Sequence, residues 1–171
     1  MDKIIGIKQM EYEDIPLLCK IGGDESEGNW KYLKRQLDNQ GKKECSALLA
    51  TYKGQIAGYV FIYYRCRWGA LKNQGIPCVV DLVVFEDYRQ KGIGMALMDA
   101  AEKIAAKYSE WVYLDVCLNS DYGPAQRLYI KRGYMPDGRG VYYEEEVCEI
   151  NAECKNDDEL TLCLVKHLKG E

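Results

Sequence analysis

The chain has 171 residues, of which 47% are apolar and 29% charged, and it carries a formal net charge of −4. These values are typical of one folded domain and exclude a disordered chain, and the scattered basic residues argue against binding to nucleic acid. The longest uncharged run, residues 54–64, has 11 residues, well below the ~18 that suggest a membrane span. The first ten residues, MDKIIGIKQM, lack a secretory signal pattern, so we expect a single cytoplasmic domain over residues 1–171.

Eight cysteines are spread along the chain without a CxxC pair, and His167 is the only histidine. A Cys/His zinc site is therefore disfavoured, and we expect no bound metal. Several of the cysteines fall inside apolar runs, which favours buried, reduced thiols over disulfides.

Hydrophobic periodicity predicts a strand, two helices and a hairpin in the first 64 residues. Trp30, Leu33 and Leu37 recur at helical spacing before Gly41, which is typical of a helix end. The dipeptide Lys53-Gly54 separates two strand-like runs and indicates a tight hairpin turn. The predicted elements are a strand at 4–10, helices at 13–21 and 29–40, and strands at 46–52 and 55–64.

A strand–helix–strand unit follows a polar loop at 65–77. The run 78-CVVDLVVF-85 is apolar except for Asp81 and predicts a strand covered on both faces. Further along, Gly133 ends another helix, and 136-PDGRG-140 predicts a turn. Their order predicts an α/β or α+β fold with a mixed sheet. The predicted elements are strands at 78–85 and 111–117, helices at 94–108 and 124–131, and strands at 141–145 and 160–165.

The stretch 88-YRQKGIGMAL-97 joins the buried strand to its helix. The first turn of a helix leaves backbone N–H groups without partners and adds roughly half a positive charge, so it favours anions. Gly92 and Gly94 let the backbone approach a ligand, while Arg89 and Lys91 add positive charge, which predicts a phosphate or pyrophosphate site. The chain lacks the Walker sequence G-x-x-x-x-G-K-[ST], and this turn lacks the third glycine of a dinucleotide fingerprint, although Asp115 lies where that fingerprint places an acid.

Two motifs follow one another along the chain. Arg89, Gly92 and Gly94 fit the pattern [Q/R]-x-x-G-x-[G/A], and 125-AQRLYIKRGY-134 fits A-x-x-L-Y-x-x-x-G-[FY]. In this order and spacing they resemble the GNAT superfamily of acyl-CoA-dependent N-acyltransferases. The resemblance implies a mixed, mostly antiparallel central sheet of six to seven strands, flanked by helices, with a splayed parallel strand pair. It also implies acetyl-CoA as co-substrate and direct transfer of the acetyl group to an amine within a ternary complex.

By this resemblance, backbone amides of the turn hold the pyrophosphate of coenzyme A, and the backbone of residues 82–84 pairs with the pantetheine arm. One amide of that strand, such as that of Val83, would polarise the thioester carbonyl. Asn119 stands in for an asparagine that relatives often carry three residues before Ala125, where this chain has Tyr122. The residues expected at the coenzyme are Leu82, Val83, Val84, Arg89, Gln90, Lys91, Gly92, Ile93, Gly94, Met95, Asn119, Ala125 and Tyr129.

Two side chains are candidates for proton transfer. Tyr129 falls at the motif position and shares a helix face with Ala125, so the resemblance makes it the acid that protonates the departing thiolate. Asp81 is the only charge in its strand and is either a general base or a hydrogen-bonded structural carboxylate. Some relatives carry the base one position earlier, where this chain has Val80.

The sequence does not identify the acceptor amine. We expect a primary amine on a small molecule, because no stretch resembles a peptide-binding groove, with a protein N-terminus or lysine as an alternative. A non-catalytic module that senses acyl-CoA is the alternative from another class, and it would follow if Asp81 is structural. The tyrosine-rich strands favour a homodimer, although exposed tyrosines could line a pocket instead.

Overall fold

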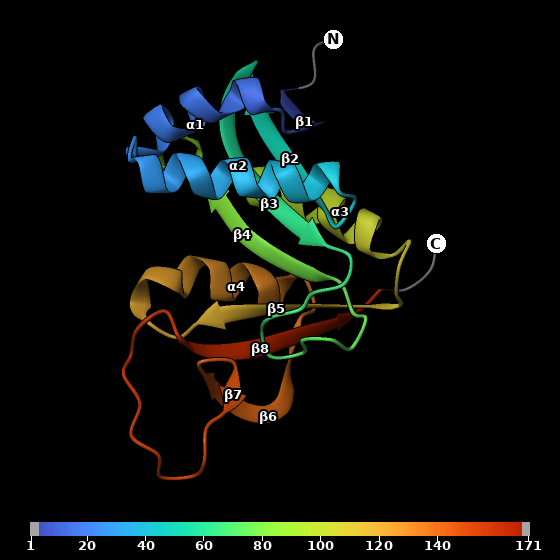
Figure 1. The fold of residues 1–171 in the computed structure, drawn as a ribbon, viewed down its shortest axis with the longest axis vertical. Helices are drawn as coiled ribbons and strands as arrows, with labels where there is room; N and C mark the ends of the chain where they lie inside the picture. Colours follow the sequence, from blue (N-terminus) through green and yellow to red (C-terminus); the bar gives the residue numbers. More distant parts are fainter. Residues whose placement is uncertain (1–3, 169–171) are drawn as a thin grey trace. The chain divides into compact units, whose positions relative to one another are not determined.

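The computed structural model describes residues 4–168, which divide into two compact units. Unit 1 comprises the residues up to Tyr63 together with Val79–Ile104, and unit 2 comprises Tyr64–Cys78 and the residues from Ala105 onward. Each unit has its own strands and helices (Figure 1). The expectation of a single domain stays a prediction.

Unit 1 is built from β1 (Ile5–Gln9), α1 (Ile15–Gly22), α2 (Glu27–Gly41), β2 (Cys45–Tyr52), β3 (Gln55–Tyr63), β4 (Cys78–Val84) and α3 (Ile93–Ala105), with 3₁₀ turns at Tyr12–Asp14 and Glu86–Tyr88. Its strands are ordered β1-β2-β3-β4, and β2 is antiparallel to both β1 and β3. The predicted turn Lys53-Gly54 joins β2 to β3, with left-handed φ angles of 49° and 79° that suit a two-residue hairpin. The hairpin prediction is therefore confirmed.

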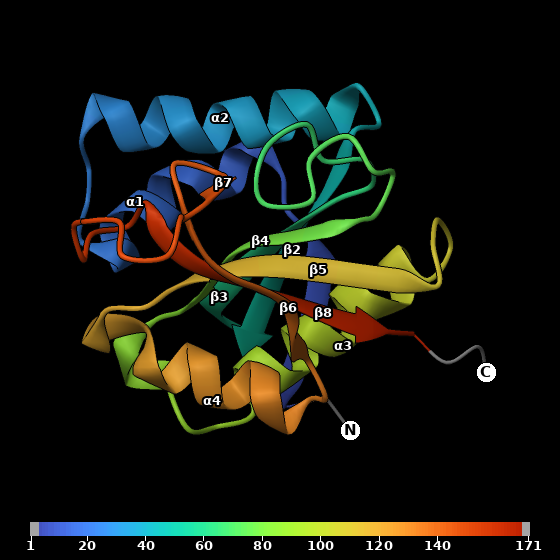
Figure 2. The same ribbon diagram turned by 90° about the horizontal axis from the view of Figure 1, so that it is seen from below.

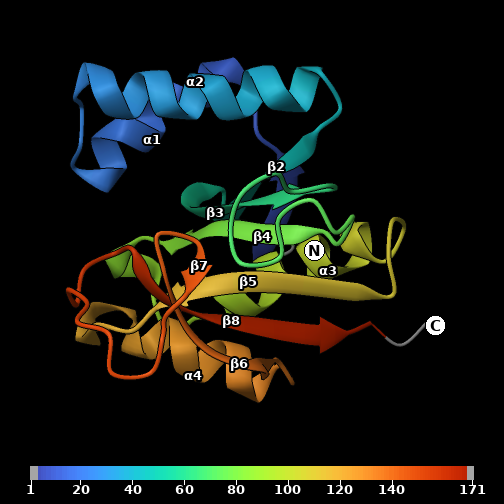
Figure 3. The same cartoon turned by 60° about the horizontal axis from the view of Figure 1, so that its bottom comes forward.

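The helices of unit 1 lie on both faces of its sheet, α1 and α2 on one face and α3 on the other (Figures 1 and 3). Pro16 lies in the first turn of α1, and Gly23 ends the helix with a φ of 73°. The Ser26 side chain accepts a hydrogen bond from the Asn29 amide at 3.2 Å and caps α2. None of the helices among residues 4–168 combines the length and apolarity needed to cross a membrane.

The backbones of β3 and β4 approach each other closely at Gly58. A Cβ atom at this position would lie 2.3 Å from the carbonyl oxygen of Val83 and 3.2 Å from the Cα of Val84. Both neighbours are main-chain atoms, so a side chain here would displace β4 itself. Gly58 therefore fixes where the backbone of residues 82–84 lies.

Replacing Gly58 by Ala is expected to destabilise the protein by about 2 kcal/mol, as overpacking of a tight interior contact does. Gly41→Ala is the matched control, because a Cβ there meets no atom within 4 Å. Urea unfolding of both variants measures the difference. Equal midpoints for Gly58→Ala and wild type would contradict the proposed role of Gly58.

Unit 2 is built from β5 (Trp111–Cys117), α4 (Gly123–Lys131), β6 (Met135–Tyr143), β7 (Glu146–Val147) and β8 (Leu160–His167), with a 3₁₀ turn at Ser120–Tyr122. β8 is antiparallel to both β5 and β6, and β7 is antiparallel to β6. Cys78, the first residue of β4, lies in this unit and is in parallel register with Tyr113 of β5. α4 runs beside β8 and β6 (Figure 2). The rings of Tyr113, Tyr134 and Tyr142 are almost fully buried and fill the interior of this unit.

The expected fold class is confirmed as a mixed α/β fold with mostly antiparallel strands and one parallel pair. The described residues form eight strands rather than six to seven, because a left-handed turn at Glu144 and Glu145 starts the short strand β7. The predicted turn at 136–140 is wrong, since these residues lie inside β6. Gly138 and Gly140 have φ angles of 82° and 85° there, and the register against β8 shifts, so the glycines form a bulge. The expected splay of the parallel pair stays a prediction.

Six of the eight cysteines are buried as expected, but Cys148 and Cys154 are not. These two thiols lie on the long loop between β7 and β8, Cys148 half-buried and Cys154 exposed, and their sulfur atoms are 3.4 Å apart. Within residues 4–168 no group of three or more His, Cys, Asp or Glu side chains could hold a metal ion.

Candidate active site

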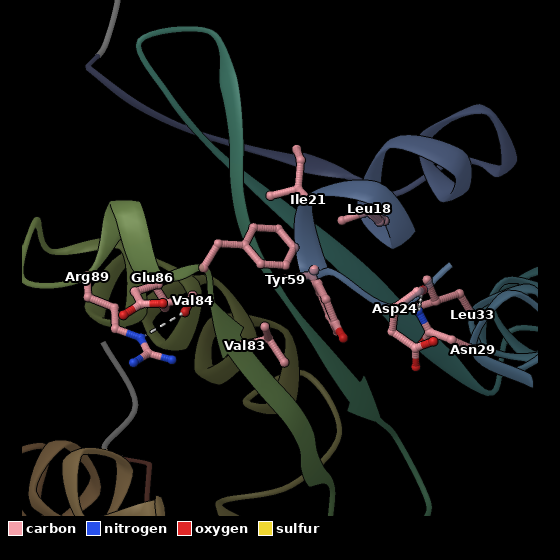
Figure 4. Close-up of a pocket in the computed structure, with 12 residues that line it drawn as sticks. Leu18, Ile21, Asp24, Asn29, Leu33, Tyr59, Val83, Val84, Glu86 and Arg89 are labelled. Carbon is pink, nitrogen blue, oxygen red and sulfur yellow. Dashed lines mark hydrogen bonds between the residues drawn. The ribbon is translucent and has the colours of Figure 1, made fainter. Parts of the chain in front are cut away.

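A pocket of about 370 Å³ opens in unit 1 beside β3 and β4. It is lined by residues of α1, α2, β3, β4, the segment that joins α1 to α2, and the 3₁₀ turn after β4. Figure 4 shows Tyr59 and Val83 in the middle of the view, with Glu86 and Arg89 to one side and Asp24 to the other. The pocket is apolar in its middle and polar at its ends, which suits a ligand with polar groups at both ends.

Asp24 is held in one position at its end of the pocket. Its side chain accepts a hydrogen bond from the Ser26 amide at 3.0 Å, and its carbonyl accepts one from the Asn29 side chain at 2.8 Å. Hydrogen bonds from Ser26 hold the pKa of Asp24 below its usual value, so the carboxylate is ionised at neutral pH. This end of the pocket therefore favours a cationic group. Neither Asp24 nor Asn29 belongs to a sequence motif, so neither was predicted as a site residue.

The glycine turn has the backbone that its sequence predicts. Gln90 and Gly92 both adopt left-handed φ angles, 58° and 81°, before α3 begins at Ile93. The Ala96 amide donates to the Gly92 carbonyl at 3.0 Å as α3 starts. The amides of residues before Ala96 thus belong to the first turn of the helix, where an anion binds favourably. Gln90, Lys91 and Gly92 are exposed, so a ligand has access to the turn.

The two basic side chains of the turn behave differently. Arg89 lines the pocket, with its Nε 3.4 Å from the Val84 carbonyl oxygen (Figure 4). Lys91 instead donates to the carbonyl of Asp87, and its ammonium group lies 5.6 Å from the ring centres of Tyr52 and of Tyr88. Lys91 therefore bends back over aromatic rings, while Arg89 is the cation that borders the pocket.

Two residues of β4 have backbone groups that point away from β3. The Phe85 amide donates to the Ala57 carbonyl of β3 at 3.0 Å, and the Val83 carbonyl also points toward β3. Because N–H groups alternate in direction along a strand, the amides of Leu82 and Val84 point away from β3. These two amides therefore suit the role of polarising a carbonyl better than the Val83 amide, which the sequence analysis suggested.

Asp81 has an unusual backbone for a strand residue. Its φ angle is 52°, in the left-handed region, although it lies in the middle of β4. The hydroxyl of Tyr32, from α2, donates a hydrogen bond to its carboxylate. The Asp81 residue is exposed at the surface of β4, yet the protein atoms around its carboxylate displace enough solvent to raise its pKa, and this effect exceeds the lowering by the hydrogen bond from Tyr32. A carboxylate tuned in this way suits a general base.

Three of the expected site residues lie in unit 2. Tyr129 is buried in α4, with 7% of its surface exposed, and its ring is 5.8 Å from that of Tyr134. Ala125 lies one turn earlier on the same helix. The Asn119 side chain caps a 3₁₀ turn through Asp121 and also donates to Asp158, which gives it a structural role. Coenzyme binding by these residues stays a prediction.

The chain matches the acetyltransferase (GNAT) domain family over residues 43–136. It is 29% identical over 153 residues to a protein of Sulfurisphaera tokodaii named N-alpha-acetyltransferase, with 80% of this chain and 89% of the relative covered. A protein of the same name from Saccharolobus solfataricus is 28% identical over 155 residues, with the same coverage.

Solved structures share the fold. Ard1 from Thermoplasma volcanium has a TM-score of 0.67 at 17% identity, and the match covers 98% of this chain and all of that one. The structure of yncA from Salmonella typhimurium, solved with its cofactor acetyl-CoA, has a TM-score of 0.68 at 13% identity, and the match covers 99% of this chain and 96% of that one. Together with the family match, these likenesses place the chain in the GNAT acetyltransferase family, as an acetyl-CoA-dependent acyltransferase.

Proposed function

We propose that this protein transfers the acetyl group of acetyl-CoA to the α-amine at the N-terminus of a polypeptide. The acceptor class is proposed because two relatives are both named N-alpha-acetyltransferase. The match to this chain covers 89% of each of them. The ionised Asp24 carboxylate at one end of the unit 1 pocket supports a cationic acceptor. A small-molecule amine, which the sequence alone favoured, is the second candidate.

The proposed acetyl transfer uses a base, backbone amides and an acid of this chain. Asp81 takes a proton from the acceptor ammonium, directly or through water, which leaves a neutral amine as nucleophile. The amine attacks the thioester carbonyl, and the outward amides of Leu82 or Val84 stabilise the developing oxyanion. The C–S bond then breaks as the amide forms, and the leaving thiolate takes a proton from Tyr129. The nitrogen loses its second proton through water, and that proton restores the Tyr129 phenol.

The turn after β4 is proposed to hold the pyrophosphate of acetyl-CoA. A diphosphate suits the exposed residues 90–92 before the helix, the left-handed Gly92, and Arg89 at the pocket edge. The arm of the coenzyme would pair with the backbone of residues 82–84, of which Val83 and Val84 line the pocket.

Gly92→Val is expected to weaken acetyl-CoA binding about tenfold, because a β-branched residue resists a left-handed φ and the turn must change shape. Gly54→Val is the control, since Gly54 has a similar φ of 79° in the β2–β3 hairpin. It should cost similar stability without changing affinity. Isothermal titration calorimetry on both variants gives the comparison, and equal losses of affinity would contradict a specific role for the turn.

An acceptor panel tests the proposed function. It contains peptides with free N-termini, the same peptides with blocked N-termini and an internal lysine, polyamines and an aminoglycoside. We expect coenzyme A release with the free peptides, and mass spectrometry should place the acetyl group on the α-amine. Release only with small amines would establish the second candidate instead. Coenzyme binding without release for any acceptor would contradict an enzyme and indicate a sensor.

Two further proposals concern the setting of the reaction. We propose that the protein acts in the cytoplasm, where its eight cysteines can remain reduced.

A homodimer is proposed from the number of tyrosines, 14 in the chain, since aromatic residues are enriched at interfaces. Light scattering after gel filtration measures the mass, and a mass of one chain would contradict the dimer.

A further inference from the structure

The backbone of Asp81 is in a conformation that a non-glycine residue rarely adopts. A left-handed φ is unfavourable for a residue with a Cβ, although aspartate accepts it more readily than most residues. Val80 and Leu82 on either side have no such angle, so the distortion is confined to one residue in the middle of β4. Strain of this kind persists where the surroundings impose it. The hydrogen-bond partner of the Asp81 carboxylate is part of those surroundings.

That partner is Tyr32, which α2 holds in a fixed position. Its hydroxyl donates to the Asp81 carboxylate. Its ring packs edge-on against Phe61 of β3, with the centroids 6.4 Å apart, and the Arg35 guanidinium lies 5.5 Å from the same ring. The neighbouring residue Leu33 is buried in the interior of unit 1. The phenol is thus held by a helix and a strand, and not by a mobile loop.

The hydrogen bond from Tyr32 and the loss of solvent shift the pKa of Asp81 in opposite directions. A hydroxyl that donates to a carboxylate stabilises the ionised form, whereas burial favours the protonated form. Burial raises the pKa of Tyr59 to about 12, with a smaller contribution from the charge of Asp81, so this second phenol is neutral at physiological pH. Burial also raises the pKa of Tyr32 well above its ordinary value, and Tyr32 therefore remains a donor wherever the enzyme works.

We propose that Tyr32 is a positioning residue for Asp81, whose hydroxyl holds the carboxylate in the rotamer and the ionised state that accept a proton from the acceptor. This inference rests on the proposed function, in which Asp81 is the base. Among the described residues, Tyr32 is the titratable side chain that shifts the pKa of Asp81, the charge of Asp81 in turn raises the pKa of Tyr59, and the Arg35 guanidinium lies 5.5 Å from the centre of the Tyr32 ring. Tyr32 itself transfers no proton.

The test is the pH profile of kcat/KM for Tyr32→Phe. Loss of the hydroxyl should move the acidic limb to higher pH by about one unit, the size expected for one hydrogen bond to a charged group. Incorporation of 3-fluorotyrosine at position 32, a stronger donor, should move the limb to lower pH. Tyr12→Phe is the matched control, because Tyr12 donates in the same way to Asp38, also on α2, and should leave the profile unchanged.

A second readout needs no activity. Carbon NMR of labelled aspartate, with the Asp81 signal assigned through Asp81→Asn, should show the pKa of Asp81 rising in Tyr32→Phe and not in Tyr12→Phe. An unmoved pKa and an unmoved profile in an active, folded Tyr32→Phe would overturn the role of Tyr32. Absence of turnover in the wild type with every acceptor would instead overturn the proposed function, while the NMR titration would still decide whether Tyr32 controls Asp81.

Discussion

Tyr129→Phe is expected to lower kcat by about 100-fold or more, the contribution of a general acid, while acetyl-CoA binds with unchanged affinity. The phenol gives the leaving thiolate its proton, and phenylalanine keeps the buried ring of α4 without the hydroxyl. Steady-state kinetics give kcat, and calorimetry gives the affinity for the coenzyme.

Tyr134→Phe provides the control for the Tyr129 variant. The two rings are neighbours, 5.8 Å apart, and Tyr134 is also buried. Its motif position accepts either Phe or Tyr by the resemblance, so this variant should keep the wild-type kcat. A Tyr129→Phe enzyme with full turnover would remove Tyr129 from the mechanism, and an equal loss in both variants would point to packing instead of proton transfer.

Asp81→Asn is expected to lower kcat/KM by about 100-fold or more at neutral pH, since the amide cannot accept the proton of the acceptor. The fold should survive the change. Asparagine tolerates a left-handed φ as well as aspartate does, and its side-chain oxygen can still accept the hydrogen bond from Tyr32. The loss would therefore report chemistry and not unfolding.

The same variant should be at least as stable as the wild type at neutral pH. The folded state raises the pKa of Asp81, so its contribution to stability is complete below the unfolded pKa and is lost as pH rises through the folded value. The advantage of Asp81→Asn in melting temperature should grow with pH across that interval and then level off. A wild type that is more stable at pH 7 would contradict a raised pKa.

Asp38→Asn is the control, because its effect on stability should change with pH in the opposite direction to that of Asp81→Asn. The hydrogen bond from Lys34 is the largest of the effects that lower the pKa of Asp38, so its contribution to stability appears above the unfolded pKa and is lost as pH falls. Asp38→Asn should thus become less stable than the wild type as pH rises. Parallel pH curves for the two variants would mean that the melting temperatures report something other than these carboxylates.

Local patterns in the sequence predicted the local parts of the site. The left-handed Gly92 and the start of α3 follow from a glycine turn between an apolar run and an amphipathic one, within a few residues of chain. The stretch 136–140 was predicted wrongly, because the same glycines that make a turn also make a bulge inside β6. The sequence pattern alone does not distinguish a turn from a bulge.

Contacts between segments that are distant in the sequence could not be predicted from the sequence. Tyr32 and Asp81 are 49 residues apart, and their hydrogen bond depends on the rotation of α2 over the sheet and on one distorted residue in β4. Asp24 reaches the pocket only because Gly23 ends α1 and the chain turns back into α2. No periodicity or motif marks Tyr32 or Asp24, whereas Asp81 was predicted as a candidate because it is the only charge in an apolar run.

The central claim is that backbone amides where residues 89–95 enter α3 bind the diphosphate of acetyl-CoA. Calorimetry that compares acetyl-CoA with S-acetylpantetheine, which has the same thioester and arm but lacks the diphosphate together with its adenosine, tests it most directly. We expect acetyl-CoA to bind at least about 100-fold more tightly, since charge-assisted hydrogen bonds to the diphosphate supply that difference. Equal affinity for the two compounds, or no binding of acetyl-CoA by folded protein, would contradict the account.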